Sequence, residues 1–174
     1  MNRSRKIIVF CHCILNSNTK VAPLATYNGV LKEAVNDFIE KGYGIIQLPC
    51  PEVTYLGMNR WGMSKDQYDH PSYRRHCKKI LEPYADQIEA FANADYQIHG
   101  VVGVNGSPSC GVSQTPIGLE GGVPGPDETP FENIKNVNQS GIFIEELKAV
   151  LESRGIAVNF MAIDEKNPSN IKDV

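Results

Sequence analysis

Short apolar runs alternate along the chain with segments in which apolar residues recur every three or four positions. Apolar, β-branched runs predict strands at residues 6–10, 43–48, 97–104 and 156–163. Helical spacing predicts helices at residues 24–39, 72–91 and 141–154, with Ser140 as the N-cap of the last. This alternation is typical of a three-layer α/β/α sandwich, Rossmann-like, with a mainly parallel sheet of about four strands and right-handed crossovers.

Two segments interrupt the alternation. Pro83 lies inside the second helical pattern and should kink or split that helix, because proline removes a backbone donor. Residues 111–139 are rich in Gly and Pro and have no periodicity. Long loops in compact domains are usually either functional or disordered, so a lid or substrate loop is one of two interpretations. The length of 174 residues suits one domain, 1–174, that includes this loop.

The charge and hydropathy of the chain indicate which partners and which cellular compartment to expect. The net charge of -3 argues against a nucleic-acid partner, which requires clustered Lys and Arg. No segment reaches the roughly 20 apolar residues that cross a bilayer, so no membrane partner is expected. The first residues imitate a signal peptide, but His12 interrupts the apolar run, and Asn16-Ser17-Asn18 follow where small residues are needed. We therefore expect a cytoplasmic protein whose cysteines remain thiols.

The cysteines carry the strongest chemical signal. Cys13, Cys50 and Cys110 each lie just beyond one of the first three predicted strands. The carboxyl ends of parallel strands share one edge of a sheet, where ligand sites of open α/β folds form, so these thiols should converge. Three soft thiolate donors suit an iron–sulfur cluster or zinc. Three unrelated buried thiols are the alternative.

The other two cysteines have different surroundings. Cys77 lies on the apolar stripe of the second predicted helix, and we interpret it as a buried core thiol. Cys11 stands two residues before Cys13, and the bend of the chain after the first strand decides whether it faces the same crevice. We interpret Cys11 as a core residue too, with a reserve ligand as the alternative.

Residues beside the three cysteines add acid–base and hydrogen-bonding chemistry. Glu52 follows Cys50-Pro51 and suits a general base toward water, with a solvated loop glutamate as the alternative. Ser107 and Ser109 precede Cys110, and their hydroxyls can donate to a sulfide or a substrate oxygen, or else cap a turn.

Further candidates are weaker. Gly111 permits backbone approach to a cluster, and Arg60 and Trp61 follow the Cys-Pro-Glu element at a distance that suggests a place in the crevice. The histidines have no metal-ligand spacing, and we interpret all four as structural: His12, His70, His76 and His99.

Three short motifs carry a family resemblance over roughly residues 6–115. Cys13-Ile14-Leu15, Cys50-Pro51-Glu52 and Ser107-Pro108-Ser109-Cys110-Gly111 resemble the signatures of the thiouracil desulfidase family. Asn16 stands where that family commonly has Gly, and residues 55–60 lack its proline, so the chain resembles a divergent single-domain member.

The resemblance implies roles for particular residues. In that family three cysteines ligate a [4Fe-4S] cluster and leave the fourth iron without a protein ligand. By resemblance the ligands are Cys13, Cys50 and Cys110. Glu52 would serve as acid/base, and Ser107 would hold or polarise the substrate.

The implied activity is desulfidation of a small-molecule thiolated heterocycle such as a thiouracil. The open iron accepts the sulfur of a thiocarbonyl, and water oxygen replaces it on carbon. One alternative is a non-catalytic iron–sulfur or zinc module for sensing or sulfur carriage. Another is a metal-free thiol enzyme with Cys50 as the nucleophile. The sequence indicates neither the natural substrate nor the oligomeric state.

Overall fold

A five-stranded sheet with the strand order β2-β1-β3-β6-β7 forms the centre of the computed structural model, which describes residues 3–122 and 133–173. Four strands are parallel: β1 (Lys6–Phe10), β2 (Gly44–Gln47), β3 (Gln97–Val104) and β6 (Phe160–Asp164). These confirm the four predicted strands. The fifth, β7 (Asn167–Asp173), pairs antiparallel with β6 and was not predicted, because its polar sequence has no apolar alternation.

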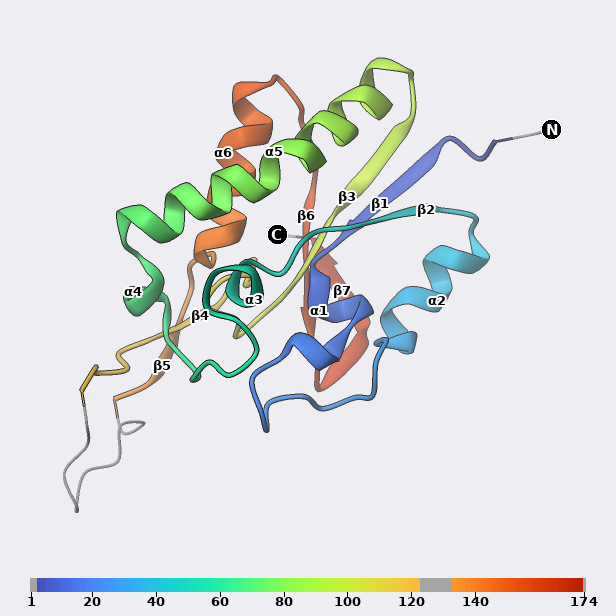
Figure 1. Cartoon of the computed structure of the whole chain (residues 1–174). Coiled ribbons are helices and arrows are strands. Elements are labelled where there is room, and N and C mark those ends of the chain that lie inside the picture. Colours follow the sequence, from blue (N-terminus) through green and yellow to red (C-terminus); the bar gives the residue numbers. More distant parts are fainter. Residues whose placement is uncertain (1–2, 123–132, 174) are drawn as a thin grey trace.

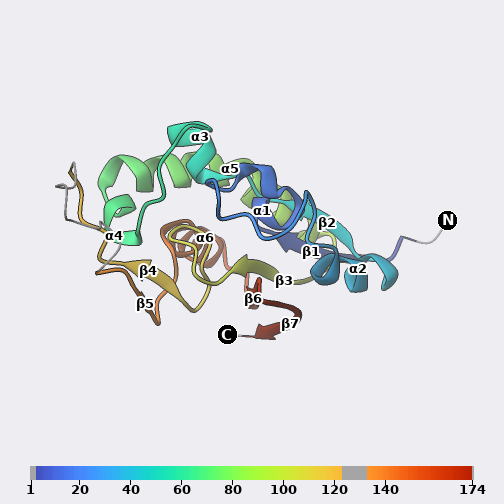
Figure 2. The ribbon, with the colours of Figure 1, turned by 90° about the horizontal axis from the view of Figure 1, so that it is seen from below.

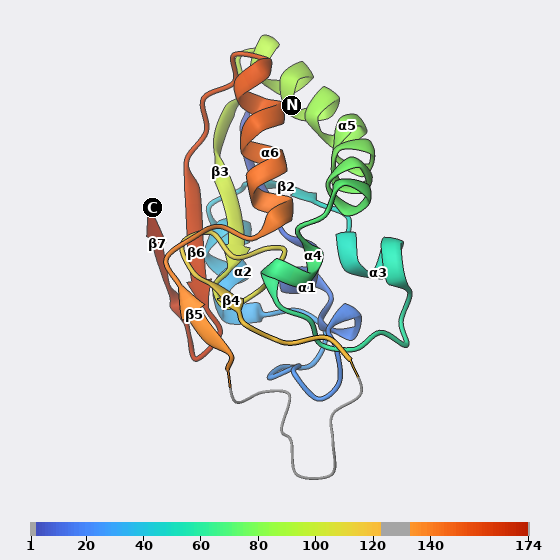
Figure 3. The ribbon, with the colours of Figure 1, turned by 90° about the vertical axis from the view of Figure 1, so that its left-hand side faces the viewer.

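Three long helices cover the two faces of the sheet. α2 (Lys32–Glu40) connects β1 to β2, α5 (Pro71–Asn93) connects β2 to β3, and α6 (Ile142–Ser153) connects β3 to β6. α5 and α6 pack side by side on one face (Figure 1, Figure 3). Figure 2 looks along the strands and shows α2 on the opposite face, where it contacts β7. The predicted three-layer α/β/α arrangement is confirmed.

The hydrophobic core explains why the central strands read as continuous apolar runs. Both faces of β1 and β3 are covered, so successive side chains such as Ile8, Val9 and Phe10 are all fully buried. Helices α5 and α6 contribute large buried side chains on one side, among them Tyr73 and Phe143. This core holds the carboxyl ends of the strands in fixed positions.

The strand order reverses between β1 and β3, since the chain first moves outward to β2 and then returns past β1. In open α/β sheets the crevice outside the carboxyl ends at such a switch point is the usual ligand site. Three short elements border it: α1 (His12–Leu15), the 3-10 helix η1 (Ser17–Thr19) and α3 (Pro51–Leu56). A fourth, α4 (Lys65–Tyr68), lies between α3 and α5 in the chain.

Two helix predictions need correction. The first predicted helix begins at Lys32 rather than Leu24, because residues 16–31 fold back on α1, where the Leu31 amide donates to the Ile14 carbonyl. Leu24 is exposed. Pro83 does not split its helix, and α5 continues through it with Leu81 and Ala85 packed in the core. Core packing offsets the loss of one backbone hydrogen bond.

The start of α6 also differs from the prediction. Gly141 is the N-cap, and Ser140 instead donates its hydroxyl to the Val112 carbonyl at 2.6 Å. The first α6 amides donate to the Pro108 and Ser109 carbonyls, so the loop after β3 satisfies this helix end. A Cβ at position 141 would lie 2.6 Å from the Ser109 oxygen, and glycine is therefore required for the close approach.

The Gly/Pro-rich segment 111–139 is not without structure. β4 (Thr115–Ile117) and β5 (Lys135–Val137) pair as an antiparallel ribbon, and the Leu119 amide donates to the Ser64 hydroxyl ahead of α4. The rest of the predicted loop, residues 123–132, lies outside the described residues. Among residues 3–122 and 133–173, no helix is both long and apolar enough to span a membrane.

Candidate functional site

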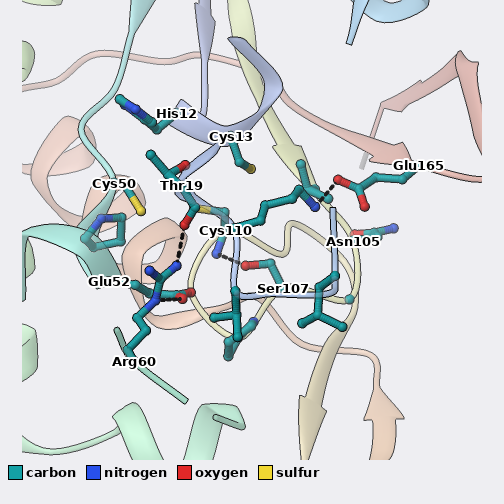
Figure 4. A pocket seen from close by; sticks show the side chains of 17 residues that line it. His12, Cys13, Thr19, Cys50, Glu52, Arg60, Asn105, Ser107, Cys110 and Glu165 are labelled. Carbon is teal, nitrogen blue, oxygen red and sulfur yellow. Dashed lines mark hydrogen bonds and ion pairs between the residues drawn. The ribbon is translucent and has the colours of Figure 1, made fainter. Parts of the chain in front are cut away.

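Three cysteine side chains line one cavity of about 250 Å³ at the carboxyl edge of the sheet (Figure 4). Cys13 lies in α1 just after β1, Cys50 is the N-cap of α3 after β2, and Cys110 ends the loop after β3. The three thiols therefore converge on one cavity, as expected. Within the described part of the chain, however, no three His, Cys, Asp or Glu side chains are gathered as a site for a single metal ion. The role of the thiols as ligands stays a prediction.

The remaining cysteines lie outside this lining. Cys77 is fully buried in the hydrophobic core on α5, as predicted for a core thiol. Cys11 is also fully buried, and it influences the site indirectly, because it raises the pKa of Cys110. Its core interpretation therefore agrees with its burial, while its side chain does not line the cavity.

The cavity favours the neutral form of the thiols in the metal-free chain. Burial raises the pKa of Cys13 well above its usual value, and it raises that of Cys50 to about 11. The hydrogen bond with Cys11 is the main cause of the raised pKa of Cys110, followed by burial. A metal centre bound here would therefore have to displace protons from all three sulfur atoms.

Glu52 lies in the first turn of α3 and forms a shielded ion pair. Arg60 donates from Nε to Glu52 Oε2 at 3.0 Å, and the two side chains are only 3% and 13% exposed. Arg60 also donates to the Thr19 carbonyl at 2.6 Å, which fixes the guanidinium between two segments. Both residues line the cavity, whereas Trp61 is 88% exposed and does not. The suggestion that Trp61 lines the crevice is therefore wrong.

The loop after β3 places Ser107 in the cavity and takes Ser109 away from it. Ser107 Oγ accepts hydrogen bonds from the amides of Cys110 at 2.9 Å and Ser109 at 3.3 Å. These two bonds cap the turn, and no described residue accepts a hydrogen bond from the Ser107 hydroxyl, so its hydrogen is available to a ligand. Ser109 is fully buried and shares a 2.8 Å hydrogen bond with the Tyr73 hydroxyl, so it cannot donate to a ligand as suggested.

Gly111 has a different purpose from the expected one. A Cβ at this position would lie 2.7 Å from the Ser107 carbonyl oxygen, within the same loop. The glycine allows the loop to fold tightly on itself, and it does not line the cavity.

Several lining residues were not predicted. His12 lines the cavity and donates from Nδ1 to the Leu48 carbonyl at 3.1 Å, which ties α1 to the end of β2. Lys20 and Glu165 line it as an ion pair, and Asn105 borders it at the end of β3. His12, Asn105 and Glu165 lie just after the ends of parallel strands, whereas Lys20 follows the 3-10 helix η1. The residue types alone are too frequent to single these four out.

Comparison with known proteins agrees with the cysteine motifs. The family model described as “Putative 2-thiouracil desulfurase” matches residues 6–154. The chain belongs to this family. An uncharacterized protein of the archaeon Methanocaldococcus jannaschii is 37% identical over 110 residues, which are 63% of this chain and 70% of that protein. No solved structure matches the chain significantly. The family match includes all three cavity cysteines and ends before Glu165.

Proposed function

We propose that this protein is a [4Fe-4S]-dependent desulfidase that removes sulfur from a thiocarbonyl group of a small thiolated heterocycle such as a thiouracil. The observation that carries the proposal is the shared cavity of Cys13, Cys50 and Cys110. Glu52 and Ser107, the two other residues matched to the family motifs, line the same cavity. The description of the family points to the same substrate class.

The donor set of the cavity fits an iron–sulfur cluster. Three thiols reach it from the ends of three different strands, and soft thiolates are the usual ligands of such clusters. With only these three protein ligands, one iron of a four-iron cluster would be available to the substrate. When bound, the cluster would supply a thiophilic Lewis acid at the thiocarbonyl sulfur.

The reaction needs no external electron donor. Water adds its oxygen to the thiocarbonyl carbon, the carbon–sulfur bond breaks, and the products are the carbonyl compound and hydrogen sulfide. Both protons of the water leave with the sulfur, so carbon and sulfur keep their oxidation states. The protein therefore has to move protons and orient the ring.

Two side chains of the cavity suit these tasks. The Glu52 carboxylate would act as the general base that takes a proton from the attacking water, and then as the acid that returns this proton to the departing sulfur. Arg60 keeps that carboxylate in place by holding one of its oxygens. The free hydrogen of Ser107 can bind a substrate heteroatom and orient the ring, because Oγ is already anchored by the Cys110 amide.

Anaerobic purification followed by iron and acid-labile sulfide analysis tests the cofactor. We expect about four irons and four sulfides per chain with a brown absorption spectrum, as for one four-iron cluster. The same preparation is then incubated with 2-thiouracil, and uracil and sulfide are measured. Equal formation of the two products supports the proposal.

Each contrary result identifies a different alternative. An iron-loaded protein that releases sulfur from no thiolated base would be a non-catalytic cluster module. Zinc in place of iron would indicate a zinc module, and full activity of metal-free protein would indicate a thiol enzyme with Cys50 as nucleophile. Any of these results overturns the proposal.

A further inference from the structure

A second charged wall of the cavity has no part in the proposed reaction. Lys20 and Glu165 form an ion pair whose side chains are 14% and 15% exposed, and both line the cavity. We infer that this pair recognises the edge of the substrate ring that carries a carbonyl oxygen beside a ring N–H, an amide-like edge. This inference rests on the proposed function. Lys20 donates to an exocyclic carbonyl oxygen, and Glu165 accepts from a neighbouring ring N–H.

The position of Glu165 follows from the fourth parallel strand. β6 ends at Asp164, and Glu165 begins the short turn that leads to the antiparallel strand β7. This turn brings its carboxylate to the same sheet edge as the three cysteines. Figure 4 shows Glu165 across the cavity from Glu52 and Arg60, with Cys110 between them. Each parallel strand of the sheet thus contributes at least one residue to the cavity.

Lys20 is held at its end of the pair by contacts that also involve Cys13. Its Nζ lies 5.7 Å from the centre of the Tyr27 ring, and the Tyr27 hydroxyl donates to the Cys13 carbonyl at 2.8 Å. The ammonium group is therefore fixed relative to the segment that carries Cys13. Such fixed placement is what orientation of a small ring requires.

Hydrogen-bonding capacity remains on the carboxylate. Lys20 is the ion-pair partner of the buried Glu165 Oε1, and no hydrogen bond from another described residue reaches this carboxylate. The carboxylate oxygen that Lys20 does not hold therefore remains as an acceptor for a ligand that supplies an N–H group. Lys20 has three donors, which leaves capacity for a ligand oxygen beside its ion pair.

The charge balance of the pair defines the class of ligand. Lys20 and Glu165 neutralise each other, so a neutral ring with one donor and one acceptor side by side satisfies both. An anionic ring would be attracted by Lys20 but repelled by Glu165, so the pair would give it no net electrostatic stabilisation. The predicted substrate is therefore an uncharged cyclic thioamide that also carries an amide-like edge, and carboxylated analogues should bind more weakly.

Equilibrium binding tests this inference separately from turnover. The dissociation constants of uracil, 3-methyluracil and orotate are measured by calorimetry on the anaerobically prepared protein. The wild-type chain should bind uracil more tightly than the other two, because 3-methyluracil lacks the N3–H beside the 4-oxo group and orotate carries a negative charge. Loss of a hydrogen bond to a charged group corresponds to about a tenfold to hundredfold weaker binding.

Two substitutions of Glu165 test its role as an acceptor and its role as a compensating charge. Glu165→Leu should weaken uracil binding about tenfold or more and remove the preference over 3-methyluracil. Glu165→Gln leaves Lys20 without a compensating charge, so the affinity for orotate should rise relative to the affinity for uracil. The double variant Lys20→Met/Glu165→Leu restores neutrality, which avoids an isolated buried charge if a single variant fails to fold. Lys166→Met, in the same turn and exposed, is the matched control and should bind as the wild type does.

The results separate this inference from the proposed function. Unchanged ligand preference in Glu165→Leu and in the double variant would overturn the inference even if the wild type releases sulfur from thiouracil. A uracil preference that is present in the wild type and lost in Glu165→Leu, in a protein that shows no turnover, would support the inference and overturn the desulfidase proposal. Unchanged iron content across the variants shows that the effect lies in ring binding.

Discussion

Two groups of ion pairs in this protein each contain well-shielded carboxylates, but only one of the groups lines the cavity of the three cysteines. The α5–α6 ion cluster consists of Lys65, Asp69, Arg74, Glu145 and Glu146. The cavity group consists of Arg60 with Glu52 and Lys20 with Glu165. Arg74 and Asp69 of the α5–α6 ion cluster are 30% and 43% exposed, but Glu146 is only 7% exposed, less than Glu52 at 13%. Burial of a carboxylate by itself therefore does not identify the site.

The difference lies in what remains for a ligand. Arg74 donates to Asp69, Glu145 and Glu146 at 2.6 to 2.9 Å, and Lys65 holds the other oxygen of Glu145 at 2.5 Å. These charged groups are paired with one another, and their ion pairs join α4 and α5 to α6. In the cavity each carboxylate has one cationic partner and borders a space lined by thiols. An ion pair alone therefore does not indicate a functional site. An ion pair that borders a cavity lined by several nucleophilic groups does indicate one.

The largest expected effect comes from removing a thiol. Cys110→Ala should lower iron content and sulfur release by more than about a hundredfold, because the centre loses one of three protein ligands. Iron analysis and thiouracil turnover after anaerobic purification measure the two effects. Cys77→Ala removes a buried core thiol instead and should retain iron. Full iron content in Cys110→Ala would contradict the ligand assignment.

The next effect separates chemistry from cofactor binding. Glu52→Gln keeps the shape of the side chain but removes its proton-accepting capacity, so turnover should fall about 10²- to 10⁴-fold with iron content unchanged. Glu146→Gln, in the α5–α6 ion cluster, is the matched control and should keep turnover within about twofold. Turnover that is equally sensitive to both changes would remove the distinction between the two groups.

A smaller effect is expected from the α5–α6 ion cluster itself. Arg74→Met leaves Asp69 without its cationic partner and removes one of the two cations that hold each of Glu145 and Glu146. It should lower the free energy of unfolding by about 2 kcal/mol. Urea unfolding of the anaerobic protein measures this change, and turnover of the folded variant should match the wild type. A loss of turnover at full stability would show that the cluster communicates with the cavity.

The smallest effect is a pH dependence of stability. The Arg74 hydrogen bond lowers the pKa of Asp69 below its ordinary value of 3.8. Ionised Asp69 therefore stabilises the fold above that ordinary pKa, and the stabilisation is lost as the pH falls through the lowered pKa. The stability difference between wild type and Asp69→Asn should be largest near neutral pH and shrink below about pH 4. A difference that does not vary with pH would contradict the assignment.

The local sequence predicts the elements whose own residues carry the signal. The apolar runs of β1 and β3 identify strands buried on both faces, and the spacing in residues 72–91 identifies α5. The β7 strand escaped prediction because it is an edge strand with polar side chains, which pairs through its backbone. The start of α2 was misplaced because contacts with α1, not local spacing, hold residues 16–31 in an irregular path.

Side-chain partners were harder to predict than positions. The sequence places Cys13, Cys50 and Cys110 at strand ends, and this suffices for their convergence because parallel strands share a carboxyl edge. It does not show that Ser109 turns toward Tyr73 or that Arg60 holds Glu52, since these bonds join segments set by the packing of separate helices.

What the sequence determined by itself is the layered α/β architecture and the family, because apolar periodicity and short cysteine motifs are local properties of the chain. Only the tertiary structure brought Lys20 and Glu165 to one wall of the cavity. These residues are separated by most of the chain, and each is ordinary in its local context. Their pairing depends on the packing of β6 against β3, a long-range contact that no local pattern contains.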